Sequence, residues 1–287
     1  MVSSRSESTS VAEADALVAT LEVADGWGAA NAAVAVVGPD GTIAKFGPTR
    51  RRFRIASVSK PLVAMAILLA VEEGALTLDD PAGPPGSTVR HLLSHAGGYG
   101  FTGPSVLAAP GTRRIYSNQG FDDLGDVLSA TTDMSTAAYL REGVFLPLGM
   151  RDSALEGSPA KDIHATVDDL ALFARDLLRP TLLAPSSMAA LTTVQFPTLA
   201  GVLPDVGRFD PNPWGLGVEI RGAKQPHWTG TRNAASTFGH FGGSGTFLWV
   251  DPAVDLAVVC LTDREFGPWA LTAWPALSDA VLRHHQA

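Results

Sequence analysis

The hydrophobic pattern of the chain changes its period twice. Residues 32–37 form an apolar, β-branched run, and the turn Gly-Pro-Asp-Gly separates it from residues 42–46. This arrangement predicts an antiparallel hairpin, and the alternation in residues 52–55 predicts a short strand after it. Strand patterns return only near the C-terminal end, at residues 214–221, 236–241, 246–251 and 254–262.

Between the two groups of strands the pattern is helical. A strongly apolar helix is predicted from Ser57 to Glu73, where Gly74 ends it, and no strand is predicted from there to about residue 212. The capping box that begins at Thr166 predicts the start of one of the middle helices. The other helices are predicted at residues 11–23, 88–94, 118–131, 136–145, 167–178 and 269–285.

Strands at both ends with helices between them predict an α+β fold. The two ends would form one antiparallel sheet flanked by helices, in a discontinuous domain of residues 11–75 and 213–287. Residues 76–212 would form an inserted, all-helical domain, and residues 1–10 a disordered tail. A cleft between two such domains is where a small molecule usually binds.

Composition and charge narrow the possible partners. The 287 residues are 46% hydrophobic and 17% charged, as in a globular protein, and the net charge of −8 argues against nucleic acid as a partner. The one cysteine, Cys260, lies in an apolar run and is interpreted as a core residue, without a disulfide or a cysteine-based metal site. No stretch is long enough to span a membrane and the N-terminus lacks an apolar signal region, which predicts a cytoplasmic protein without a membrane partner.

The segment Ser57-Val58-Ser59-Lys60 places a hydroxyl and an amine three residues apart at the start of the apolar helix. In a helix these side chains share one face, with Cβ atoms about 5–6 Å apart. Lysine titrates at about 10.4 in water, so it can accept a serine proton near neutral pH only if burial and the helix N-terminus lower its pKa. Ser57 and Lys60 are therefore a candidate nucleophile and base; the alternative is a capping serine with a solvated lysine.

A second copy of this spacing, Ser158 to Lys161, has Pro159 between the two groups and no apolar helix after it, so we interpret it as a surface loop.

Two further segments carry polar groups that could take part in catalysis. Tyr116-Ser117-Asn118 could relay a proton and bind an amide, or simply begin a helix. The run from His240 to Gly245 lies between two predicted strands, and its backbone could face an oxyanion or form only a glycine-rich bulge.

In their order along the chain, the three elements resemble the serine β-lactamase and penicillin-binding-protein superfamily. Its members carry S-x-x-K, then Y-x-N, then K-T-G or H-x-G on a strand. The matching residues here are Ser57 and Lys60, Tyr116 and Asn118, and His240 and Gly242. The resemblance covers residue 34 to the C-terminus and extends to the segments at 53–57, 89–95, 110–118, 147–150 and 214–217.

This resemblance implies a β-lactamase/transpeptidase-like fold and a role for each motif residue. Ser57 would be the acylated nucleophile, Lys60 its base and Tyr116 a proton relay, while Asn118 would contact the lysine and the substrate amide. The backbone N–H groups of Ser57 and Gly243 would form the oxyanion hole. No metal or cofactor is implied.

Further residues are candidates for the wall of the cleft or for a metal site. His240 and Gly242, with Tyr99 and Trp214, are candidate substrate-binding residues, and Trp228 is a further aromatic candidate. His91 and His95 have a spacing found in zinc sites, but no glutamate lies between them, so we interpret them as core or capping residues.

The chain departs from the penicillin-recognising members at the third motif, where His240 replaces lysine. With Y-x-N rather than S-D-N and no deacylating E-x-x-L-N segment, the chain is more similar to class C enzymes, D-stereospecific peptidases and related esterases. The sequence thus predicts a serine hydrolase for a small ester or amide. Acyl transfer from the same intermediate, or ligand binding without turnover, are the alternatives.

The replacement of lysine by His240 predicts that esters are cleaved faster than β-lactams, because a neutral imidazole attracts the lactam carboxylate only weakly. The measurement compares kcat/KM for short-chain 4-nitrophenyl esters, a chromogenic cephalosporin and D-amino-acid amides. Turnover of the cephalosporin at the rate of the best ester, or faster, would contradict the prediction.

Overall fold

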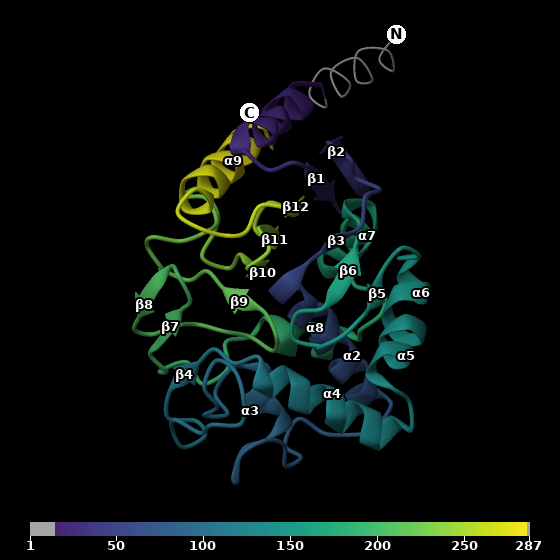
Figure 1. Ribbon diagram of the computed structural model, residues 1–287, viewed down its shortest axis with the longest axis vertical. Helices are drawn as coiled ribbons and strands as arrows, with labels where there is room; N and C mark the ends of the chain where they lie inside the picture. Colours follow the sequence, from purple (N-terminus) through teal and green to yellow (C-terminus); the bar gives the residue numbers. More distant parts are fainter. Residues whose placement is uncertain (1–14, 286–287) are drawn as a thin grey trace.

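The structure, a computed structural model, describes residues 15–285. Its centre is a six-stranded antiparallel sheet in the order β2-β1-β12-β11-β10-β9 (Figure 1). The strands are β1 (Ala32–Gly38), β2 (Gly41–Phe46), β9 (Glu219–Ile220), β10 (Phe238–Gly242), β11 (Thr246–Asp251) and β12 (Leu256–Thr262). Because β1 pairs with β12, with Val34 opposite Cys260, the two ends of the chain form one sheet as predicted.

Both faces of this sheet are covered, which explains why its inner strands are apolar at nearly every position. Ala35 and Val259 face a core shared with α2 (Ser59–Glu72) and α7 (Val167–Leu178). Val34 and Cys260 face a second core, which α9 (Ala270–His285) closes. Residues 15–21 are helical and lie beside α9, at the top of Figure 1. The buried position of Cys260 confirms its interpretation as a core residue.

Most of the remaining helices lie at the bottom and right of Figure 1, away from α9, while α8 (Pro185–Thr192) is labelled near its centre. The others are α3 (Val89–Leu93), α4 (Gln119–Thr132), α5 (Thr136–Leu140) and α6 (Leu146–Leu148), with the π-helical turn Arg141–Phe145 after α5. The predicted helices therefore form close to their expected bounds. At α7 the Thr166 hydroxyl accepts a hydrogen bond from the Asp169 N–H at 3.0 Å, as the capping box predicts.

Helix α2 lies between the sheet and the other helices, and its residues from Ser59 to Leu68 are buried on all sides. A neighbouring loop approaches it very closely at Gly217, whose φ is +78°. A Cβ at Gly217 would stand 2.3 Å from the Cβ of Ala64, so only glycine fits here. This contact brings the segment before β9 directly against the helix that carries the S-x-x-K motif.

The α+β fold class is confirmed, but the inserted region is not purely helical. It also contains β4 (Arg114–Ile115), β5 (Ala154–Leu155), β6 (Ile163–Ala165), β7 (Gly201–Leu203) and β8 (Gly207–Phe209). Strands of two or three residues are too short to show an alternating pattern, which is why none was predicted. The strand β3 (Phe53–Arg54) pairs with β6, across the predicted domain boundary.

Two other expectations concern the strand at residues 214–221 and the N-terminal residues. The strand predicted at 214–221 shrinks to β9 and one isolated bridge between Trp214 and Glu219, because Gly215 and Gly217 turn the chain between them. The predicted tail, residues 1–10, and residues 11–14 of the first predicted helix lie outside the described residues. No helix within residues 15–285 has the length and apolar character needed to cross a membrane.

Candidate active site

Ser57 lies in a 3-10 turn, Ala56–Val58, that leads directly into α2. The residue before it, Ala56, has a φ of +47°, a left-handed conformation that is strained for a residue with a Cβ. The turn continues into the helix, so the side chains of Ser57 and Lys60 share one face, and the Lys60 Nζ lies 3.3 Å from the Ser57 Oγ. The structure thus brings the predicted nucleophile and base together.

The amine of Lys60 is fully buried and its hydrogens have two acceptors. Nζ donates to the Oδ1 of Asn118 at 2.8 Å and to the carbonyl oxygen of Ala160 at 2.9 Å. Ser57 Oγ, 3.3 Å away, is the third oxygen around Nζ. In the neutral amine, which has two N–H groups, the bonds to Asn118 and Ala160 would leave the lone pair to accept from the Ser57 hydroxyl. Burial lowers the pKa of Lys60 well below its ordinary value of 10.5; the carboxylate of Asp122 opposes this shift and the ammonium of Lys161 adds to it. The site therefore favours an amine that can accept the Ser57 proton.

The third motif holds His240 as a neutral imidazole of one tautomer. Its Nδ1 lies 2.6 Å from the carbonyl oxygen of Phe241, which can only accept, so Nδ1 carries the proton. Its Nε2 then accepts from the Tyr116 hydroxyl, 3.4 Å away. Burial is the main cause that lowers the pKa of His240 to about 3, and Lys60 contributes when it carries a proton.

Tyr116 is held in its neutral form between these groups. Burial raises the pKa of its phenol, the hydroxyl of Ser57 opposes the shift, and the carboxylate of Glu219 adds to it. A phenol that keeps its proton cannot serve as the resting base. It can, however, pass on one proton while receiving another, since a hydroxyl is both donor and acceptor.

The strand of the third motif is fixed against the turn of Ser57 by short contacts. A Cβ at Gly242 would lie 2.5 Å from the carbonyl oxygen of Ile55, so glycine is required where β10 contacts the turn of Ser57. The hydroxyl of Ser244 donates to the carbonyl of Arg54 at 2.7 Å, and that of Thr246 to the carbonyl of Ile55 at 2.8 Å. Gly243, between them, has open space around it and lines the same cleft as Ser57.

The cleft itself has a volume of about 450 Å³. Its wall includes the predicted residues Ser57, Tyr116, Asn118, His240 and Gly243. Phe101 and Lys161, of the second S-x-x-K segment, also line the cleft. The wall further includes Pro204, Asp205, Glu265 and Phe266, which come from loops without a recognisable motif and were not predicted.

Three predicted substrate-binding residues, Tyr99, Trp214 and Gly242, lie outside this wall. The hydroxyl of Tyr99 donates to Asp123 at 2.6 Å, on the side of α4. Trp214 is buried behind the site, edge-on to Tyr116 and His240 with ring centroids 5.9 and 5.7 Å away. Gly242 contributes close packing rather than an open surface. Trp228 is also buried, against Phe241 and Phe247.

The two histidines of the zinc-like spacing belong to the packing around the site. His91 stacks on Phe196 with centroids 4.6 Å apart. His95 accepts from the N–H of Ser117 at 3.2 Å and packs against the ring of Tyr116 at 4.4 Å. Among residues 15–285 no group of three or more His, Cys, Asp or Glu side chains could hold a metal ion.

The second S-x-x-K segment is not the surface loop that we expected. Ala160 is fully buried and its carbonyl accepts from Lys60, while Lys161 reaches the wall of the cleft. The hydroxyl of Ser158 donates to Asp122 instead of meeting Lys161. The prediction failed because a loop with polar residues was taken as solvated, although the contacts that bury it come from α2 and α4.

A family model described as beta-lactamase matches residues 19–282. The chain belongs to the beta-lactamase family. This membership and the observed fold agree with the resemblance seen in the sequence.

Two curated relatives match part of this beta-lactamase-family chain. Penicillin-binding protein 4* of Bacillus subtilis is 30% identical over 138 residues, and Esterase EstB of Burkholderia gladioli is 30% identical over 147 residues. The matches cover 37% and 35% of the chain. They span 31% and 37% of those two proteins, about a third of their length.

Solved structures match over nearly the whole chain. The crystal structure of a beta-lactamase from Mycobacterium bovis is 54% identical, with a TM-score of 0.92, over 93% of this chain and 100% of that one. EstCE1, a hydrolase with promiscuous acyltransferase activity, shares the fold with a TM-score of 0.77 at 18% identity, over 95% of this chain and 99% of that one.

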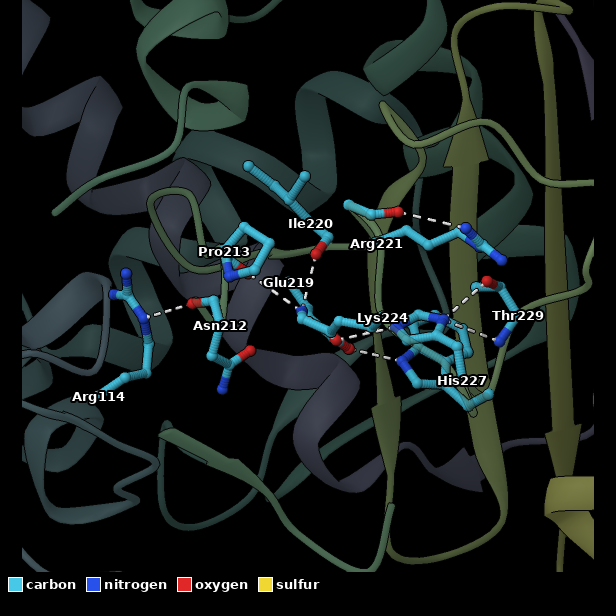
Figure 2. Close-up of polar contacts among 11 residues, drawn as sticks. Arg114, Asn212, Pro213, Glu219, Ile220, Arg221, Lys224, His227 and Thr229 are labelled. Carbon is cyan, nitrogen blue, oxygen red and sulfur yellow. Dashed lines mark hydrogen bonds and ion pairs between the residues drawn. The ribbon is translucent and has the colours of Figure 1, made fainter. Parts of the chain in front are cut away.

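Behind the cleft of this beta-lactamase-family chain lies a buried ionic cluster around Glu219 (Figure 2). Its Oε1 accepts from the Nζ of Lys224 at 2.6 Å and from the Nε2 of His227 at 2.9 Å, and its Oε2 accepts from the indole N–H of Trp228 at 2.5 Å. Lys224 also donates to the carbonyls of Pro213 and Ile220, so all three of its N–H groups have acceptors. The charges are thus buried but fully paired.

This cluster supports the aromatic wall of the site. Glu219 lies on β9 directly opposite Gly239 of β10, one residue before His240. The ammonium of Lys224 lies 5.8 Å from the ring of Trp214, which in turn packs against Tyr116 and His240. Burial alone would raise the pKa of Glu219, but the charges of Lys224 and His227 outweigh it and lower that pKa. No motif marks these residues in the sequence.

Removing only the anion of this cluster should destabilise the protein strongly. Glu219→Met leaves the Lys224 ammonium buried without its partner, and the free energy of unfolding in urea should fall by about 3–5 kcal/mol at pH 7. The matched variant Glu219→Met/Lys224→Met removes both charges and should recover most of that loss. A double variant no more stable than the single one would contradict this account.

The pH dependence gives an independent check of the same cluster. Because the folded-state pKa of Glu219 lies below its ordinary value of 4.5, its stabilising contribution is present above that pH and lost as the pH falls below it. The unfolding free energy of the wild type should therefore decrease between pH 5 and 3 more steeply than that of the double variant.

Proposed function

We propose that the protein is a serine hydrolase that cleaves a small ester or amide through an acyl intermediate on Ser57. The observation that carries this proposal is the buried amine of Lys60, which contacts Asn118 and Ala160 and lies 3.3 Å from the Ser57 hydroxyl. A serine hydroxyl is a weak nucleophile until a base of suitable pKa removes its proton.

Each motif residue then has a defined part in acylation. Lys60 takes the Ser57 proton while Oγ attacks the carbonyl carbon, and the backbone N–H groups of Ser57 and Gly243 stabilise the oxyanion. As the tetrahedral intermediate collapses, Tyr116 gives its proton to the leaving oxygen or nitrogen and receives the one held by Lys60. Asn118 holds the amine of Lys60 and offers its amide N–H₂ group to the substrate.

Deacylation reverses these transfers with water in place of the leaving group. A water molecule gives a proton to the neutral Lys60 and Tyr116 pair as its oxygen attacks the acyl carbon. When the bond between this carbon and Oγ breaks, Oγ takes that proton back, and the acid leaves. The curated relatives include an esterase and a penicillin-binding protein, which supports ester or amide chemistry without fixing the substrate. An alcohol or amine in place of water would give acyl transfer from the same intermediate.

Covalent labelling tests the nucleophile directly. A fluorophosphonate probe should add one adduct mass to the wild type by intact mass spectrometry, and none to Ser57→Ala, whose kcat/KM for an ester should fall by at least about 10³-fold. The matched control is Ser158→Ala, the serine of the second S-x-x-K segment, which should be labelled like the wild type. Labelling of Ser57→Ala at the wild-type rate would refute the assignment.

The charges near Lys60 predict how activity depends on pH. Lys60 must be neutral to act as a base, so kcat/KM should rise with pH through its pKa, which burial holds well below 10.5. Asp122 raises this pKa and Lys161 lowers it. The rising limb should therefore shift to lower pH in Asp122→Asn and to higher pH in Lys161→Gln, and shifts of the same sign in both variants would contradict the role of Lys60.

A further inference from the structure

A second cavity of about 460 Å³ adjoins the active-site cleft. The two share Phe101, Tyr116 and Pro204 in their walls, so the phenol ring of the proposed relay separates one space from the other. Phe101 stacks on this ring with centroids 5.8 Å apart. The second cavity is therefore the space next to the one in which a substrate would meet Ser57.

The floor of this cavity is one face of the small sheet β4-β7-β8. Ile115 of β4 is paired with Val202 of β7, and Val202 is paired with Arg208 of β8, so the three side chains form a row across the sheet. Val202 is 55% exposed, and Phe101 and Leu107, which line the same cavity, are 53% and 62% exposed. Large apolar side chains gathered around one exposed hollow are typical of a binding site.

The charged residues of this cavity are all arginines. Arg114 is buried, and its guanidinium is bonded to backbone carbonyls, among them those of Asn212 and Gln195. Arg113 and Arg208 are exposed, and neither forms an ion pair among the described residues. No aspartate or glutamate lines the cavity, although the chain as a whole has a net charge of −8.

The adjoining cleft has a different balance of charge. There Asp205 and Glu265 accompany Arg54 and Lys161 in the wall. The excess of positive charge is therefore confined to the second cavity, where Arg113, just before β4, and Arg208, on β8, line the wall on either side of β7. Guanidinium groups bind carboxylates with paired, charge-assisted hydrogen bonds.

We propose that the second cavity is a substrate subsite for an apolar substituent that ends in a carboxylate. This inference rests on the proposed function and names its substrate class: an ester or amide whose apolar segment lies on Ile115 and Val202. The terminal carboxylate is bound by Arg113 and Arg208. The substituent can belong to the acyl part or to the leaving group, and the experiment separates the two.

The test compares substrates that differ only in the terminal charge. One pair carries it on the acyl part, 4-nitrophenyl hexanoate and the mono-4-nitrophenyl ester of adipic acid. The other carries it on the alcohol, benzyl hexanoate and 4-carboxybenzyl hexanoate. For each pair, the measured quantity is kcat/KM for the charged substrate divided by kcat/KM for the neutral one. This ratio is compared between each variant and the wild type, so that the intrinsic reactivity of the substrates cancels.

In one of the two pairs, Arg113→Met/Arg208→Met should lower this ratio about 10-fold, the loss expected for a charge-assisted bond worth about 1.4 kcal/mol. Arg208→Glu should lower the ratio further, because it places a repelling charge at the same position. Activity on the neutral members should stay within about 2-fold, and added salt should reduce the wild-type ratio but not that of the double variant. Arg232→Met is the matched control, since Arg232 is exposed and lies outside both cavities.

The outcomes distinguish this inference from the proposed function. If the wild type hydrolyses the neutral esters through Ser57 but both ratios are the same in all variants, the subsite is wrong and the proposed function stands. If no substrate is hydrolysed and Ser57 takes no probe, the proposed function itself fails. An equal loss in Arg232→Met would show a long-range effect of net charge and would also overturn the subsite.

Discussion

The buried amine of Lys60 is the constraint on which the rest of the site depends. An ammonium group taken out of water would cost several kcal/mol, so its position in the apolar helix α2 favours the neutral form. Asn118 and Ala160 accept its two hydrogens. Those acceptors come from the start of α4 and from the loop after β5, so the chemistry of one side chain depends on three separate segments meeting.

Close backbone packing is what holds these segments at the required distances. Gly217 lets a loop lie directly on α2, and Gly242 lets β10 lie against the turn that carries Ser57. The strained φ of Ala56 turns the chain so that the nucleophile precedes the helix instead of being buried within it. Hydroxyl bonds from Ser244 and Thr246 then hold this turn against the sheet.

Behind the cleft, aromatic and ionic groups fix the orientation of Tyr116 and His240. His95 and Trp214 pack against the ring of Tyr116, and the pair Glu219–Lys224 lies beneath Trp214. Every donor of that lysine has an acceptor, which is the condition under which a buried ion pair is tolerated. The front of Tyr116, by contrast, opens on two cavities, so one phenol contributes both to the reacting centre and to the boundary of a neighbouring space.

The sequence by itself determined the features that depend on neighbours within a few residues: the bounds of α7 and its Thr166 cap, the hairpin of β1 and β2, and the shared face of Ser57 and Lys60. The spacing of apolar residues along the sequence, every three to four residues in a helix and every second residue in a strand, indicates such features directly. The resemblance of the ordered motifs added Tyr116, Asn118 and His240. Only the tertiary structure decided that the Ala160 carbonyl would meet Lys60, that Glu219 would pair with Lys224, and that strands of two or three residues would build a second cavity. Those contacts join residues whose own segments carry no periodic pattern, because long-range packing and not local backbone preference brings them together.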